Sequence, residues 1–98
     1  MKLEDSRKKI DAIDTEILIL LNRRAEVSRE IGVLKLAAGL PVVDEGREDD
    51  ILRRIAREND GAMRDNAVVD IYRAILRESR RIQIDTRSGI VEEAQQRR

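Results

Sequence analysis

The sequence predicts an all-α fold with three helices in each chain, one long helix followed by two shorter ones. Three observations predict this class. Apolar residues recur with a heptad period over residues 3–34, hydrophobic and charged residues each make up 41% of the 98 residues, and Pro41 is the only proline. High charge combined with helical periodicity is typical of long helices. Because Tyr72 is the single aromatic residue, the core must be aliphatic.

The first helix is expected over residues 3–38. Its seam consists of two series of apolar residues that repeat every seven positions: Leu3, Ile10, Ile17 and Ile31 in one, and Ile13, Leu20, Val27 and Leu34 in the other. Gly39 suits a left-handed C-terminal cap, and Pro41 prevents the helix from continuing. Such a helix is about 50 Å long. This exceeds the span of a compact domain of this size, so a partner chain is expected.

The second helix is expected over residues 46–59, after a short connection. Asp44 precedes it as a natural N-cap, because its side chain can accept a hydrogen bond from a free N–H group of the first turn. The helix has one narrow apolar face, which includes Ile51. The sequence Asn59–Asp60–Gly61 then predicts a turn.

The third helix is expected over residues 65–84, with an apolar stripe that includes Tyr72. The remaining residues, 85–98, are predicted to form a loosely held polar tail, because Gly89 interrupts the pattern and the end is polar. No shift in composition marks a boundary, so residues 1–98 are expected to form a single domain.

Charge and composition narrow the range of functions. The chain has 20 Lys and Arg and 20 Asp and Glu residues, a balance that argues against nucleic acid as a partner. No apolar run approaches membrane-spanning length and nothing resembles a signal peptide, so we expect a cytoplasmic protein with no membrane partner. The absence of His and Cys excludes the usual zinc sites and cysteine or serine–histidine nucleophiles. Neither a metal nor a cofactor is expected.

Two cations interrupt or flank the seam of the first helix. Arg24 occupies a position where an apolar residue is expected, and Lys35 lies one position beside the seam. With Ser28 they share one face, and about 16 Å of axial rise separates the two cations. Burying a cation is costly unless an anion meets it, so we interpret this face as half of a binding site for a small dianion. Taken singly, Arg24 could instead reach out of an interface seam, and Lys35 could favour the helix C-terminus.

Arg7 lies about 25 Å from Arg24 along the same helix and cannot reach the same small ligand within its own chain. Two copies of the helix packed antiparallel around a two-fold axis would remove this difficulty. With a crossing near Leu18 to Leu20, Arg7 of one chain lies opposite residues 29–33 of the other, between Arg24 and Lys35. We therefore predict an intertwined homodimer with shared sites. Without the dimer, Arg7 reads as an ordinary exposed arginine.

Four further polar residues are candidates for the site. Arg47 and Glu48 open the second helix, where they either cap it or face the cations with Glu48 as a hydroxyl acceptor. Ser79 and Gln83 lie four residues apart on or beside the apolar stripe of the third helix, where polar groups need partners. Hydrogen bonds to a neighbouring helix are the alternative for this pair.

Five short segments, in this order and at these spacings, resemble the all-helical chorismate mutase family. The resemblance covers roughly residues 3–83 and rests on these segments: Arg7–x–x–Ile10–x–x–Ile13–Asp14, Leu20–Leu21–x–Arg23–Arg24, Ile31–Gly32–x–x–Lys35, Pro41–Val42–x–Asp44–x–x–Arg47–Glu48 and Ser79–x–x–x–Gln83. It implies an intertwined dimer of three-helix chains. It also implies an enzyme, an isomerase that converts chorismate to prephenate in phenylalanine and tyrosine biosynthesis.

The resemblance also implies a role for each candidate. Arg24 and Arg7 of the partner subunit would hold the two substrate carboxylates, and Lys35 would contact a carboxylate and the ether oxygen. Gln83 would donate to the same ether oxygen. Glu48 with the Asp44 backbone would bind the ring hydroxyl. Ser79 with Arg47 would support the ring carboxylate end.

Two other functions remain open from the sequence. An isochorismate-pyruvate lyase could use the same scaffold, although the Asp44–x–x–Arg47–Glu48 segment favours the mutase. A non-catalytic dimerisation or regulatory module could bind the ligand without turning it over. The full polar set argues against this module, because a scaffold would not require Lys35, Glu48 and Gln83 together.

Overall fold

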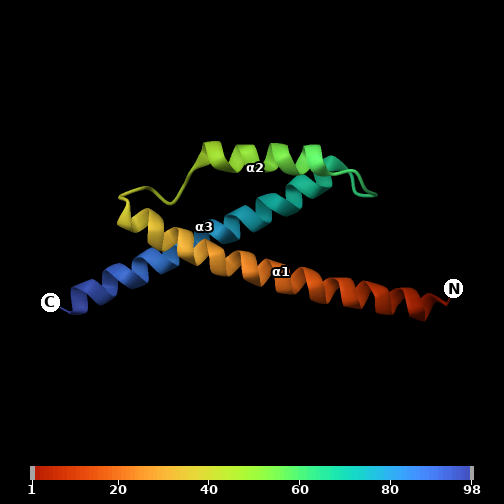
Figure 1. Cartoon of the computed structure of the whole chain (residues 1–98), viewed down its shortest axis with the longest axis horizontal. Helices are drawn as coiled ribbons and strands as arrows, with labels where there is room; N and C mark the ends of the chain where they lie inside the picture. Colours follow the sequence, from red (N-terminus) through yellow and green to blue (C-terminus); the bar gives the residue numbers. More distant parts are fainter. Residues whose placement is uncertain (1, 98) are drawn as a thin grey trace.

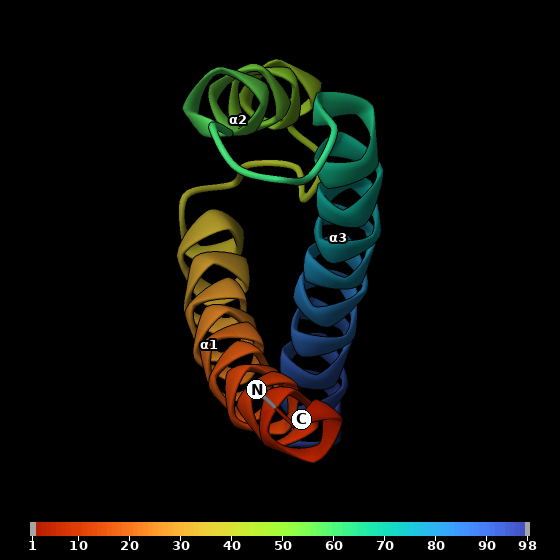
Figure 2. The same ribbon diagram turned by 90° about the vertical axis from the view of Figure 1, so that its right-hand side faces the viewer.

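The computed structural model describes residues 2–97, and within them the all-α class is confirmed, with three helices and no strand. These are α1 (Leu3–Ala37), α2 (Glu45–Glu58) and α3 (Asp65–Gln96). Helix α3 crosses the C-terminal half of α1, and α2 packs on α3 (Figures 1 and 2). The N-terminal half of α1 and the C-terminal end of α3 project in opposite directions from this crossing (Figure 1).

The end of α1 follows the predicted cap. Gly39 has a φ of +69°, and its N–H donates to the carbonyl of Leu36 at 3.1 Å. The N–H of Leu40 donates to the carbonyl of Lys35 at 2.8 Å. These two bonds form a Schellman motif, which satisfies carbonyls that a helix end leaves free. The chain therefore turns sharply at Gly39 and places the connecting loop beside the Lys35 side chain, which donates to the Val42 carbonyl.

Asp44 caps α2, as predicted. Its carboxylate accepts a hydrogen bond from the Arg47 N–H at 3.0 Å. The helix begins at Glu45, so Glu45 and Glu48 both lie in its first turn, where acidic groups interact favourably with the positive end of the helix dipole. This local arrangement sets the direction in which Arg47 and Glu48 leave the backbone.

The third helix is longer than expected, because α3 continues through the segment predicted as a polar tail and ends at Gln96. Gly89 costs a helix only about 1 kcal/mol relative to alanine and does not break it. Local pairs support the extension: Arg81 bonds to Asp85, and the Thr86 hydroxyl donates to the Ile82 carbonyl at 2.7 Å. A long-range bond adds to them, because Arg87 donates to the carbonyl of Leu40 at 2.6 Å.

A single chain buries little apolar surface. Ile51 and Leu76 are the buried hydrophobic residues, whereas the seam of α1 is open, with Ile10 and Leu20 each 58% exposed. The radius of gyration is 17.7 Å, against about 13 Å for a compact domain of 100 residues. The described residues therefore leave most of the seam of α1 uncovered. Within the same residues, no helix is both long and apolar enough to cross a membrane.

Gly32 allows α1 and α3 to approach each other closely. A Cβ atom at this position would lie 3.2 Å from the Cα and 3.4 Å from the Cβ of Gln83. The obstacle includes backbone, which cannot rotate away as the end of a flexible side chain could. A glycine therefore allows the two helices to cross closely beside Gln83, whereas an alanine would force them to shift by a few tenths of an ångström.

Replacing the two helical glycines should separate the effect of helix–helix packing on stability from the effect of helix propensity. Gly32→Ala is expected to lower the free energy of unfolding by about 1–3 kcal/mol, because the helices must move apart. Gly89→Ala is the matched control: nothing lies within 4 Å of its Cβ position, so it should raise stability by about 0.5–1 kcal/mol. Urea unfolding of both variants measures this difference. Equal stabilities, or a more stable Gly32→Ala variant, would contradict the close crossing.

Candidate functional site

A cavity of about 200 Å³ lies where α1, the following loop, α2 and α3 meet. All the predicted site residues except Arg7 line it. The complete lining is Arg24, Ser28, Ile31 and Lys35 from α1, Val42 and Asp44 from the loop, Arg47, Glu48 and Ile51 from α2, and Leu76, Ser79, Arg80 and Gln83 from α3. The fold thus brings together residues that are up to 59 positions apart, from Arg24 to Gln83.

Ser79 joins α3 to α1 on one side of this cavity. Its hydroxyl oxygen accepts a hydrogen bond from Nη1 of Arg24 and another from the hydroxyl of Ser28, at 3.2 Å. Ser28 is only 4% exposed, so this bond satisfies a buried polar group. Ser79 therefore makes hydrogen bonds to a neighbouring helix, as its alternative interpretation predicted. The same contacts hold the Arg24 guanidinium at the edge of the cavity.

Lys35 and Gln83 meet on the other side of the cavity. The Lys35 ammonium donates to Oε1 of Gln83 at 2.9 Å and to the Val42 carbonyl at 2.7 Å. An ammonium group has three N–H donors, so one remains after these two bonds. Because Gln83 accepts through Oε1, its amide NH₂ group is left to donate. Two donor groups from different helices, the Lys35 ammonium and the Gln83 amide, are thus available at one end of the cavity.

Glu48 forms an ion pair with a residue that the sequence analysis did not select. Arg80 donates from Nε to Oε2 of Glu48 at 2.6 Å and from Nη2 to Oε1 at 2.7 Å. These hydrogen bonds raise the pKa of Arg80 above its ordinary value. A signal was present in the sequence: Arg73, Arg77 and Arg80 recur on one side of the third helix, and the second helix begins with several acidic residues. Which of these charges meet depends on how the two helices pack.

The cavity carries an excess of positive charge. Its lining includes four cationic side chains, Arg24, Lys35, Arg47 and Arg80, against the two anionic side chains of Asp44 and Glu48. An excess of two positive charges matches a dianion. Among residues 2–97, no three acidic side chains lie close enough together to hold a metal ion.

Arg7 is the predicted site residue that one chain does not bring to the cavity. It lies near the start of α1, where its side chain is 65% exposed and 3.9 Å from the carboxylate of Glu4. The N-terminal half of α1 extends away from the crossing that forms the cavity (Figure 1). Within the described chain, Arg7 therefore takes the position of an ordinary exposed arginine. Its role in a shared site depends on a second subunit.

Comparison with known proteins places this geometry in a family. The sequence profile described as chorismate mutase type II matches residues 6–84. A bifunctional chorismate mutase/prephenate dehydratase from Aquifex aeolicus is 43% identical over 79 residues, which are 76% of this chain and 22% of that protein. The chain spans 16–22% of the length of the first curated relatives that it matches.

Solved structures agree over most of the chain. A chorismate mutase from Thermus thermophilus superposes with a TM-score of 0.82 and 31% identity, covering 85% of this chain and 94% of that one. A chorismate mutase from Helicobacter pylori in complex with prephenate superposes with a TM-score of 0.78 and 28% identity, covering 86% and 91%. Because the profile also matches most of the sequence, the chain belongs to the chorismate mutase type II family.

Proposed function

We propose that the protein is a chorismate mutase, an enzyme that rearranges chorismate to prephenate in a homodimer with shared active sites. The observation that carries this proposal is the contact between Lys35 and Gln83, which leaves two donor groups at one end of a cavity with excess positive charge. Chorismate is a flexible dianion, so its charge complements that excess. The prephenate complex of the Helicobacter pylori relative supports the choice of ligand.

The chemistry requires positioning and fixed charge. The Claisen rearrangement breaks the C–O bond of the enolpyruvyl ether and forms a new C–C bond within the same molecule, with no net transfer of a proton or an electron. Restraining the substrate in its reactive shape removes part of the entropic barrier. Negative charge grows on the ether oxygen as the C–O bond breaks, and Lys35 and Gln83 donate to it. Such donors stabilise the transition state more than the ground state.

The other residues bind the rest of the substrate. Arg24 holds one carboxylate, and Ser79 with Arg47 supports the ring carboxylate end. Glu48, with the backbone of Asp44, binds the ring hydroxyl. This assignment is supported by the cavity lining, which includes all five residues. It also supports the mutase over a lyase, because the Asp44–Arg47–Glu48 segment faces the same space as the cationic residues of α1.

The second carboxylate needs a further cation, which we assign to Arg7 of the partner subunit in an antiparallel dimer. The uncovered seam of α1 supports this assembly, since exposed large apolar residues run along most of the helix. An apolar groove of about 250 Å³ between α1 and α3 is lined in part by Arg24 and Ser79, so it adjoins the cavity. A second copy of α1 seated there would bring its N-terminal half beside the site. A cytoplasmic location stays a prediction from the sequence.

Product analysis tests this function. Purified protein incubated with chorismate is expected to form prephenate, identified by chromatography against a standard, and boiled protein should form none. Incubation with isochorismate in parallel tests the lyase, which would release salicylate and pyruvate. A rise in melting temperature with chorismate but no product would instead indicate a non-catalytic binding module. Either of these two results would overturn the proposal.

A further inference from the structure

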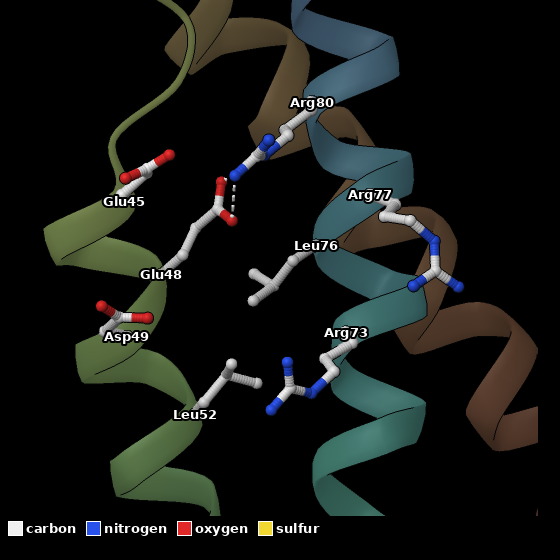
Figure 3. A pocket seen from close by; sticks show the side chains of 8 residues that line it. All are labelled: Glu45, Glu48, Asp49, Leu52, Arg73, Leu76, Arg77 and Arg80. Carbon is white, nitrogen blue, oxygen red and sulfur yellow. Dashed lines mark hydrogen bonds and ion pairs between the residues drawn. The ribbon is translucent and has the colours of Figure 1, made fainter.

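The pair between Glu48 and Arg80 joins α2 to α3 at the edge of the candidate site (Figure 3). Both carboxylate oxygens accept from the guanidinium, at 2.6 and 2.7 Å. Bidentate pairs of this kind restrict orientation as well as position, because the guanidinium is planar. The Glu48 side chain is 21% exposed and that of Arg80 is 38% exposed, so both groups are partly shielded from solvent.

The Glu48–Arg80 pair lines two adjacent cavities. Besides the candidate site, both residues line a neighbouring cleft of about 350 Å³ between α2 and α3, with Glu45, Asp49, Leu52, Arg73, Leu76 and Arg77. In Figure 3, Arg80 faces Glu48 across this cleft, whereas the guanidinium of Arg77 points away from α2. Arg80 is therefore the cation that decides whether the Glu48 carboxylate stays at the wall of the candidate site.

Repulsion makes this restraint necessary. Glu45 lies on the same helix three residues before Glu48, and it also lines the neighbouring cleft. Like charges this close destabilise one another. Without Arg80, the carboxylate of Glu48 would lose its only ion-pair partner among the described residues and could take other rotamers. Arg80 offsets the repulsion and selects one rotamer.

We propose that Arg80 is a positioning residue, which holds the Glu48 carboxylate where it accepts the hydrogen bond of the substrate ring hydroxyl. This inference rests on the proposed function. Each carboxylate oxygen has a second lone pair beside the one that Arg80 uses, so Glu48 can accept from Arg80 and from a hydroxyl together. The Arg80 guanidinium stays charged at any working pH, as every arginine does, so it remains a partner for the carboxylate. Arg80 acts through Glu48 and makes no bond to the substrate itself.

A double-mutant cycle tests this role. Arg80→Gln is expected to lower kcat/KM for chorismate by about 10- to 100-fold, because a misplaced binding group is costly. In a Glu48→Gln background the same change should cost less than about twofold, because its target is already altered. Arg80→Lys should recover part of the loss through charge alone. Arg77→Gln is the matched control, one turn away on α3, and should behave like the wild type.

The outcomes separate the two proposals. Wild-type turnover is measured first, and failure to form prephenate overturns the proposed function together with this role. If the wild type is active, an equal loss from Arg80→Gln in both backgrounds assigns Arg80 a direct contact with the substrate and overturns the positioning role. Unchanged kinetics in Arg80→Gln also overturn it. Circular dichroism and urea unfolding of each variant verify that the chains compared are folded.

Discussion

Lys35→Ala is expected to lower kcat for chorismate by at least about 10²–10³-fold, the usual cost of removing one donor from a developing oxyanion. The structure explains why one lysine matters so much. Its ammonium bonds to Gln83 and to the Val42 carbonyl, so its loss removes one donor and releases the amide that supplies the other. One donor to the ether oxygen would then be absent and the other would be misplaced.

The control for this variant is Lys8→Ala. Lys8 lies on the same helix but on the side away from the heptad seam, and it is exposed. Both variants should keep the circular dichroism of the wild type, because an alanine favours a helix. Steady-state kinetics on folded protein then measures the effect. Near-normal turnover of Lys35→Ala would contradict the role of Lys35 in the transition state.

Mixing two inactive variants, Arg7→Ala and Arg24→Ala, is expected to restore part of the activity. In a head-to-tail dimer each site takes Arg7 from one subunit and Arg24 from the other. A heterodimer of the two variants therefore has one site that lacks both arginines and one site that keeps both. With random pairing of equal amounts, about a quarter of all sites should be intact.

The experiment requires exchange of subunits and proof that it has happened. The two variants can be purified with different tags, mixed under partial denaturation, refolded, and isolated as heterodimers by sequential affinity steps. Each variant refolded alone is the control and should stay inactive. Confirmed heterodimers without activity would contradict the shared site, as would a monomeric wild-type protein. Arg23→Ala in place of Arg24→Ala tests specificity, since Arg23 does not line the cavity.

Sequence signals predicted correctly those features that depend only on residues close together in the chain. The Gly39 turn and the Asp44 cap were predicted from residues within one turn of each feature, and both are present. The predicted end of the third helix was wrong, because a polar composition with one glycine does not stop a helix. The extended part also bonds outside the helix, from Arg87 to Leu40, between residues 47 positions apart. No local pattern contains such a contact.

In the candidate site, too, features set by neighbouring residues were predicted and contacts set by helix packing were not. Helical spacing alone placed Arg24, Ser28 and Lys35 on one face and predicted their association with an anion. Arg80 was missed because its importance depends on facing Glu48, 32 residues earlier in the chain. A row of arginines on one helix and several acids on another allow many pairings. Only the packing of α2 on α3 selects one of them.

The sequence by itself determined the three helices, the face of the first helix that carries the cations and the family to which the chain is similar, because periodicity and capping act between neighbours. The tertiary structure decided that Lys35 and Gln83 touch, that Gly32 lets the helices cross, and that Arg80 pairs with Glu48. These contacts depend on how whole helices cross, a property that emerges from the packing of all their side chains together.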